Sequence, residues 1–270
     1  MDVSDTFNVT QIGTGSETLV LAHGFGSDQT AWHYQAEAFR DKYRIVLFDY
    51  LGCGKSDISS YSPVEYASLD RYSDDIITIY DTLGLSSTIF VGHSVSAMIG
   101  ALASVKRPEF FQKLVFVGAS PRYLNDDGYI GGFTQADLDQ LYRGMAEDYL
   151  DWVTGFSQLA MRNSDRPELG RVFARSLSAM RPDIAQSTAR VIFESDMRAH
   201  LPHIEPPVLI LQSQNDIAVP LDVGAYLAAQ IPDNTLVVLP SEGHFPHMSA
   251  PQIVTDAIRA FIAPQEINKM

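Results

Sequence analysis

The stretch "IFVGHSVSAMIG" at residues 89–100 decides the fold. Its first three residues are hydrophobic and lead into Gly92-His93-Ser94-Val95-Ser96, after which small and apolar residues continue. A strand, a sharp turn and a helix, with serine at the turn, is the pattern of a nucleophile elbow. Such a turn holds the serine in a strained backbone conformation and lifts its hydroxyl above the sheet. The pattern therefore makes Ser94 the candidate nucleophile.

The residues around Ser94 are small, as close packing of a strand against the following helix requires. Gly92, Ser96 and Ala97 fill this role. Ser96 stands where the usual G-x-S-x-G pattern has its second glycine, so an ordinary glycine-rich strand-to-helix turn is the alternative interpretation. The following helix is apolar on all sides, which predicts that it is buried. Its N-terminus directs partial positive charge at Ser94.

Short hydrophobic runs recur along the chain and predict a sheet. They are continuous, as expected of central strands covered on both faces. Helical patterns at 70–83, 95–106 and 221–230 lie between them, which favours an α/β fold with a mostly parallel central sheet flanked by helices. The alternating run 7–12 predicts an antiparallel edge strand. The predicted central strands are 18–24, 43–49, 88–94, 113–120, 207–216 and 235–244.

The alternation of strands and helices stops between about 121 and 200, a segment that we expect to be helical throughout. Pro167 and Pro182 each suit the first turn of a helix. We predict a cap of about four helices at 121–200, inserted into a core formed by 1–120 and 201–270. Apolar residues at spacings of three and four indicate one amphipathic face, and they are Leu138, Leu141, Met145, Tyr149, Trp152 and Phe156.

Composition excludes several classes of protein. A formal charge of −14 over 270 residues disfavours binding to nucleic acid or to an anionic membrane surface. Cys53 is the single cysteine, which excludes an internal disulfide and fits a reducing compartment. The N-terminus has neither the basic flank nor the apolar core of a signal peptide, and no apolar run approaches the roughly 18 residues of a membrane span. We therefore expect a cytoplasmic protein.

A serine nucleophile needs a base and a group that orients the base. In this architecture the chain order is serine, acid, histidine. Asp216 follows the predicted strand 207–216, and His244 follows the strand 235–244. The carboxyl ends of parallel strands meet at one edge of the sheet, so Ser94, Asp216 and His244 are predicted to converge as a catalytic triad.

Other acidic and histidine residues are candidates for the same two roles. His247 is an alternative base three residues after His244, and Asp49 also ends a strand but precedes the nucleophile, so a structural role is expected for it. His23 and His93 are expected to form hydrogen bonds within their own loops, and Glu242 to point away. The histidines have no metal-ligand spacing, so no metal is expected. No dinucleotide fingerprint follows a strand, and no cofactor is predicted.

An acyl-transfer serine also needs an oxyanion hole. The backbone N–H of Val95, next to the nucleophile, is the first expected donor. The loop "HGFGSD" at 23–28 follows an early strand, and the N–H of Phe25 is the second expected donor. Each such donor is typically worth about 10²–10³ in rate. A plain tight turn is the alternative interpretation of this loop.

The chain resembles the α/β-hydrolase superfamily over nearly its whole length. Within it, the chain is similar to the group containing the bacterial stress regulator RsbQ and the plant karrikin and strigolactone receptors. The resemblance rests on "HGFGSDQTAW", "FDYLGCGKSD", "VGHSVSAMIG", "SPRYLNDDGYIGGF", "MRPDIAQS", "IFESDMR" and "GHFPHMS", several of which lie in the predicted cap.

The resemblance implies a four-helix V-shaped cap over a hydrophobic pocket. Its implied lining is Phe25, Phe133, Trp152, Phe156, Phe193, Ile217 and Ala218, although some of these aromatics could simply pack cap on core. It also implies slow cleavage of small esters or butenolide-type lactones and, in several members, action through a protein partner. For RsbQ, that partner is a phosphatase of the general stress response.

Three hypotheses follow. The first is a serine esterase or lactonase acting on a small, largely apolar substrate. The second is a signalling protein in which the same residues sense a small ligand and a shift of the cap recruits a partner. The third, a haloperoxidase-like or C–C-bond hydrolase, fits the cap motifs less well.

Overall fold

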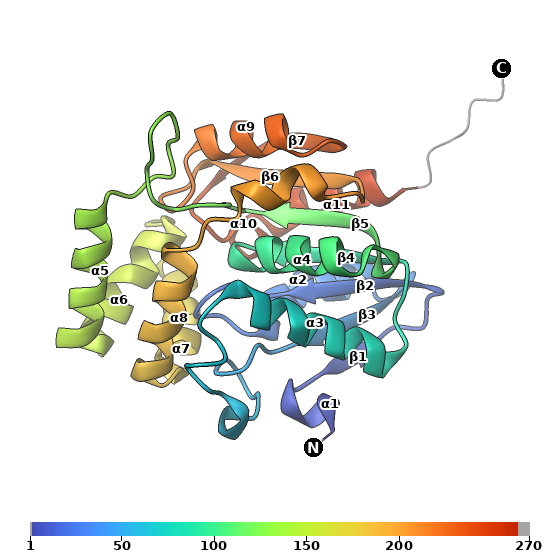
Figure 1. Ribbon diagram of the computed structural model, residues 1–270, viewed down its shortest axis with the longest axis horizontal. Helices are drawn as coiled ribbons and strands as arrows, with labels where there is room; N and C mark the ends of the chain where they lie inside the picture. The colour runs from blue at the N-terminus through green and yellow to red at the C-terminus, as the bar shows by residue number, and fades with distance from the viewer. Residues whose placement is uncertain (1, 264–270) are drawn as a thin grey trace.

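The computed structural model describes residues 2–263, and its centre is a sheet of seven strands (Figure 1). The strands lie in the order β1-β3-β2-β4-β5-β6-β7, and every neighbouring pair is parallel except β1 with β3. All seven predicted strands are present. Their bounds are β1 Thr10–Ile12, β2 Glu17–Ala22, β3 Tyr43–Phe48, β4 Thr88–His93, β5 Phe111–Val117, β6 Val208–Asn215 and β7 Asn234–Glu242.

The first strand is shorter than the sequence indicates. Of the predicted run 7–12, only Thr10–Ile12 pairs with β3, and the short helix α1 (Val3–Thr6) precedes it. Phe7 is buried, and its carbonyl accepts a hydrogen bond from the Asp49 amide at 2.8 Å. The alternation in 7–12 thus reflects one buried anchor followed by an edge strand, rather than a six-residue strand.

Helices cover both faces of the sheet, which explains why the strands are continuously hydrophobic. Helices α2 (His33–Phe39) and α11 (Pro251–Ile262) cover one face, where strand residues such as Leu19, Ile89 and Val115 pack. Helices α3 (Leu69–Leu83), α4 (Val95–Lys106) and α9 (Leu221–Gln230) cover the other, over residues such as Val20 and Phe90. Helix α10 (Pro246–Ser249) is a short turn before α11.

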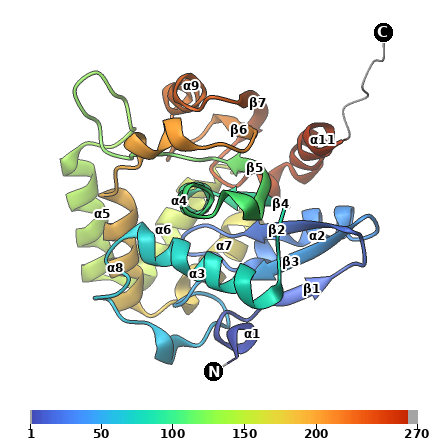
Figure 2. The same ribbon diagram turned by 45° about the vertical axis from the view of Figure 1, so that its right-hand side comes forward.

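Four helices lie between β5 and β6 in the chain, and we call them the cap helices. They are α5 (Gln135–Glu147), α6 (Tyr149–Met161), α7 (Pro167–Ala179) and α8 (Pro182–Phe193). Figures 1 and 2 show them gathered on one side of the sheet. Pro167 and Pro182 occupy the first turns of α7 and α8, as predicted. Whether the chain divides into domains at 121 and 200 remains a prediction.

Two expectations for this segment were wrong. Residues 121–134 form a loop, closed by isolated bridges between Leu124 and Phe133 and between Asp126 and Tyr129, so the segment is not helical throughout. The predicted amphipathic face also does not belong to one helix. It is divided between α5 and α6 at Asp148, whose carboxylate accepts a hydrogen bond from the Asp151 amide at 3.0 Å. An N-terminal capping residue starts a new helix although the apolar spacing continues.

Among residues 2–263, no helix combines the length and the apolar character that crossing a membrane would require.

Candidate active site

Ser94 occupies a sharp turn between β4 and α4. Its φ of 56° and ψ of −125° are disfavoured for a residue with a side chain. The turn is held because the Ser94 amide donates to the Val117 carbonyl at 2.8 Å, on neighbouring strand β5. A Cβ atom at Gly92 would lie 2.7 Å from the backbone of Ser96 and Ala97, so this strand can approach α4 only with glycine there. The strain and the close packing are those of a nucleophile elbow.

Ser96, which replaces the usual second glycine, has a structural role of its own. Its buried hydroxyl donates to the His23 carbonyl, at the start of the loop that carries Phe25. The substitution therefore adds a hydrogen bond between α4 and the 23–28 loop instead of disturbing the turn.

The structure brings Ser94, His244 and Asp216 together. Nε2 of His244 lies 2.8 Å from Oγ of Ser94, and Nδ1 of His244 lies 2.8 Å from Oδ2 of Asp216. The second carboxylate oxygen of Asp216 accepts the amides of Ala218 at 2.8 Å and Val219 at 3.2 Å. These amides fix the carboxylate, so that Oδ2 faces the imidazole. All three side chains are largely removed from solvent.

His244 lies in a loop that contacts the cap helices directly. Its amide donates to the Ala160 carbonyl near the end of α6 at 2.8 Å, and the Gly243 amide donates to Asn215 at 2.9 Å. Gly243 has a φ of 81°, and a Cβ there would lie 2.0 Å from the Met161 carbonyl oxygen. Glycine is thus required for this loop to pass so close to α6. The position of the imidazole depends on the cap helices as well as on β7.

The position of His93 differs from the one expected from the sequence. It was predicted to bond within its own loop, but its Nε2 lies 2.8 Å from the carbonyl oxygen of His244. His23 bonds both within its loop and outside it, because Nδ1 contacts the Gly24 carbonyl at 2.9 Å and Nε2 accepts the Tyr50 amide at 3.1 Å. Burial and the neighbouring histidines, His247 foremost, hold the pKa of His93 well below its usual value.

The alternative base and acid lie elsewhere. His247 stacks on Trp32 with ring centroids 4.3 Å apart, and within residues 2–263 neither of its ring nitrogens has a hydrogen-bond partner. Burial lowers the pKa of His247 to about 3. Asp49 accepts the amides of Gln29 and Lys55 at 2.8 and 2.9 Å, so it ties loops together. Glu242 is half exposed beside Arg162, at 3.8 Å.

Of the two expected oxyanion donors, the Phe25 amide belongs to a residue of the cavity lining and the Val95 amide directly follows Ser94. Val95 is the first residue of α4, where backbone amides have no partner inside the helix. Phe25 lies in the turn after β2 and lines the cavity at Ser94. Neither amide donates to a protein acceptor within the part of the chain that the structure describes. Both are therefore free to donate to a bound oxygen atom.

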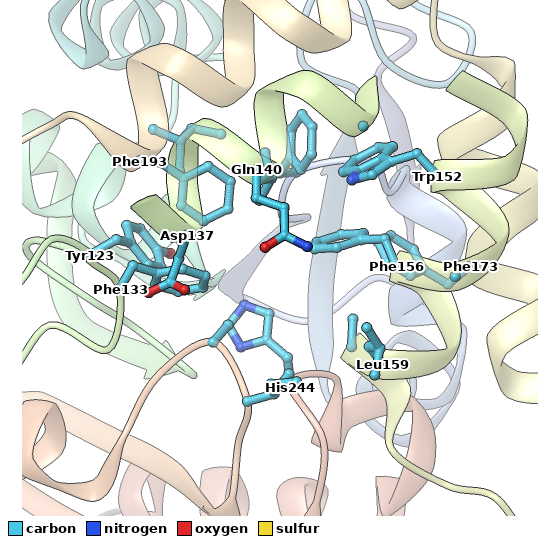
Figure 3. Close-up of a pocket in the computed structure, with 18 of the residues that line it drawn as sticks. Tyr123, Phe133, Asp137, Gln140, Trp152, Phe156, Leu159, Phe173, Phe193 and His244 are labelled. Carbon is cyan, nitrogen blue, oxygen red and sulfur yellow. The ribbon is translucent and has the colours of Figure 1, made fainter. Parts of the chain in front are cut away.

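A cavity of about 620 Å³ lies above Ser94 and His244, between the core and the cap helices. Its walls are mainly aromatic, and Trp152 stacks on Phe156 with ring centroids 4.8 Å apart. Figure 3 shows Phe133 and Phe193 on one side of the cavity and Trp152 and Phe156 on the other, with His244 at its base. All seven residues implied by the resemblance line it, namely Phe25, Phe133, Trp152, Phe156, Phe193, Ile217 and Ala218.

Tyr123 is a site residue that sequence reasoning missed. Its hydroxyl lies 3.2 Å from Oγ of Ser94, and its ring packs edge-on against Phe193. Burial raises the pKa of Tyr123, so the phenol stays protonated. The available signal was its position, since it follows β5 at the carboxyl edge where Ser94, Asp216 and His244 also lie.

In the described residues, no group of three or more His, Cys, Asp or Glu side chains is placed to hold a metal ion.

Comparison with known proteins agrees with this geometry. The α/β hydrolase fold family matches residues 17–251. The chain belongs to this family. It is 45% identical to karrikin insensitive 2 receptor CA of Petunia hybrida, over 93% of this chain and 94% of the relative, and 41% identical to a strigolactone esterase of Arabidopsis thaliana, over 96% and 97%. A hydrolase from Oleispira antarctica superposes with a TM-score of 0.94 at 34% identity, covering 96% of both chains.

These relatives confirm the expected α/β-hydrolase fold and the similarity to the karrikin and strigolactone receptor group. The family and the esterase among its members support a hydrolase of the esterase or lactonase type.

Proposed function

We propose that the protein is a serine hydrolase that cleaves a small, neutral, largely apolar ester or lactone. The observation that carries the proposal is the continuous hydrogen-bonded chain from Ser94 through His244 to Asp216, with both contacts at 2.8 Å, at the base of an aromatic cavity. A serine hydroxyl is a weak nucleophile unless a base removes its proton, and this arrangement supplies one.

In the proposed mechanism, Oγ of Ser94 attacks the acyl carbon while Nε2 of His244 takes its proton. Asp216 accepts the Nδ1–H of His244, which selects the tautomer with a free Nε2 lone pair and stabilises the imidazolium. The amides of Phe25 and Val95 donate to the oxyanion. The proton on His244 then passes to the leaving oxygen, and an acyl-enzyme remains on Ser94.

Deacylation repeats these steps with water as the nucleophile. His244 takes a proton from the water, the hydroxide attacks the acyl carbon, and Ser94 leaves with its proton returned. For a lactone, the leaving oxygen stays attached to the acyl group, so one hydroxy acid is released. No step requires a cofactor.

The cavity supports the proposed substrate class. Its aromatic walls favour apolar groups. Among the described residues that line it, four are acidic, namely Asp137, Glu147, Asp148 and Asp151. Together with the net charge of −14, these acids disfavour an anionic substrate.

The proposal is tested with 4-nitrophenyl acetate and a fluorophosphonate label. We expect the wild-type protein to hydrolyse the ester and to be labelled, and Ser94→Ala to lose both. Ser104→Ala is a matched control, because Ser104 is buried in α4 away from the cavity. Labelling that persists in Ser94→Ala would refute the assignment of the nucleophile.

A second function is favoured by one contact, the hydrogen bond from the His244 amide to Ala160 in α6. We propose that the protein can also act as a ligand-gated signalling protein, since this hydrogen bond couples a displacement of His244 by a ligand or acyl group to the end of α6. The similarity to a karrikin receptor supports this possibility, as does the resemblance to RsbQ, whose partner is a phosphatase.

Turnover separates the two functions. A metabolic esterase should turn over its substrate well above ~1 s⁻¹, whereas a receptor would be far slower. A screen of short esters, butenolides and other lactones against the purified protein, measuring both turnover and melting temperature, distinguishes them. Fast turnover with no ligand-dependent change in melting temperature would contradict the signalling function.

A further inference from the structure

Gln140 is the one uncharged amide side chain among the described residues that line the cavity. It lies on α5 together with Asp137, Leu141 and Gly144, at the spacing of three and four that places residues on one helix face. Figure 3 shows its amide directed into the middle of the cavity, between the Phe193 side and the Trp152 side.

The Gln140 amide, in the second turn of α5, differs from the polar side chains at the start of this helix. Thr134 bonds to Asp137 at 2.6 Å, and Gln135 bonds to Asp139 at 2.9 Å. Gln140 has no such partner within residues 2–263, and it remains accessible to solvent. Its donor and acceptor are therefore free for a molecule in the cavity.

A bound ligand would displace water from this amide. The loss of water leaves the amide unpaired unless the ligand supplies a partner, and an unpaired polar group costs binding free energy. Once a ligand covers the amide, the loss of water lowers the local dielectric and strengthens a hydrogen bond formed there. A wholly apolar ligand is therefore expected to bind less tightly than one that forms a hydrogen bond with Gln140.

We infer that Gln140 is a specificity-determining residue and that the preferred substrate has two polar ends. One end is the ester or lactone carbonyl at Ser94, and the other is a neutral hydrogen-bonding group, such as a ketone, ether or hydroxyl oxygen, at Gln140. Apolar atoms between them contact the aromatic walls. This inference rests on the proposed hydrolase function and narrows its substrate class.

The second polar group is neutral rather than anionic. Asp137 lies three residues before Gln140 on the same helix face, and Glu147, Asp148 and Asp151 also line the cavity. Arg143 is the only arginine or lysine among the described residues of the lining. A carboxylate or phosphate near Gln140 would face this excess of negative charge. A ketone or hydroxyl does not.

Two pairs of esters test the inference, because the group at Gln140 can belong to either side of the scissile bond. The first pair, 4-nitrophenyl levulinate and 4-nitrophenyl 4-methylpentanoate, exchanges a ketone for an isopropyl group on the acyl side. The second pair, 4-acetylphenyl acetate and 4-isopropylphenyl acetate, makes the same exchange on the leaving group. The readout is the ratio of kcat/KM for the polar ester to that for its apolar isostere.

We expect Gln140→Met to lower this ratio in at least one pair by about two- to tenfold, the range expected for one neutral hydrogen bond. Comparing the variant with wild type cancels differences in intrinsic reactivity. Gln135→Met makes the same substitution on the same helix outside the cavity lining, and it should leave the ratios as in wild type. Melting temperatures of both variants establish that they are folded.

The results can separate a failure of the role of Gln140 from a failure of the proposed hydrolase function. Ratios that are unchanged by Gln140→Met in both pairs, with the esters still hydrolysed, would overturn the role of Gln140 and leave the proposed hydrolase intact. Hydrolysis of none of the four esters by the wild-type protein, or hydrolysis that survives in Ser94→Ala, would refute the proposed function itself.

Discussion

Nε2 of His93 lies 2.8 Å from the carbonyl oxygen of His244, across 151 residues of sequence. A carbonyl oxygen only accepts, so Nε2 carries the proton. Because burial holds the pKa of His93 well below its usual value, the ring is neutral and Nδ1 is bare. The residue before the proposed nucleophile thus donates a hydrogen bond to the backbone of the proposed base.

We therefore expect His93 to be a positioning residue for His244. His93→Leu should lower kcat more than it raises KM, because the imidazole of His244 loses its fixed position relative to Ser94. It should also lower the free energy of unfolding by about 1–3 kcal/mol, since a buried carbonyl loses its donor. Steady-state kinetics and urea unfolding measure the two effects.

The matched variant is His93→Gln, whose side-chain amide can donate from a position similar to Nε2. We expect it to recover part of the kcat lost in His93→Leu. If both variants keep the wild-type kcat, or if stability falls while kcat does not, His93 has only a structural role.

The sequence predicted much of this site because its signals are local. The carboxyl edge of a parallel sheet can be recognised without knowledge of tertiary contacts. It lies where a hydrophobic strand ends in a small residue and a serine, or in an aspartate or a histidine. Ser94, Asp216 and His244 could be placed in this way. The strands were also found directly, since burial on both faces gives continuous apolar runs.

What the sequence could not predict depends on contacts between distant segments. The His93–His244 and His244–Ala160 hydrogen bonds join positions whose sequence neighbours carry no sign of the pairing. The division between α5 and α6 at Asp148 was missed because the apolar spacing continues through the capping residue. Tyr123 lies in a loop without regular structure, where periodicity gives no signal.

Ser94 offers a test of backbone strain. At a φ of 56° glycine is favoured over any residue with a Cβ. Ser94→Gly should therefore be more stable than Ser94→Ala by about 1 kcal/mol, although glycine also gains entropy in the unfolded chain. Both variants should be inactive. Chemical denaturation of the two proteins measures the difference, and a more stable alanine variant would show that the turn is not strained.

Asp216 is expected to act through the tautomer of His244. Asp216→Asn keeps the size of the side chain but offers an N–H₂ group where Nδ1 needs an acceptor. We expect kcat to fall by about three to four orders of magnitude, as in other triads. Asn215→Asp changes the charge at the neighbouring, exposed last residue of β6 and is the control for a change of charge beside Asp216. Wild-type turnover in Asp216→Asn would show that another acceptor orients His244.

His247 should make the protein less stable in mild acid. Its side chain is fully buried, and burial lowers its pKa to about 3, against about 6.5 when unfolded. Between these values the unfolded chain binds a proton that the folded protein does not, so stability is lost as the pH falls. For this one group, the free energy of unfolding should decrease by about 2 kcal/mol from pH 7 to pH 5.

The comparison of wild type with His247→Phe measures this contribution together with the effect of His247 on the pKa of its neighbour His93. Phenylalanine can keep the stacking on Trp32, whose ring centroid lies 4.3 Å away. Asp75, whose pKa burial raises to about 6, changes stability in the opposite direction, but it is present in both proteins and cancels. His203→Phe, at an exposed position, is the control. Urea unfolding at pH 7 and pH 5 should give a smaller pH effect in His247→Phe alone. An equal effect in all three proteins would mean that folding does not lower the pKa of His247.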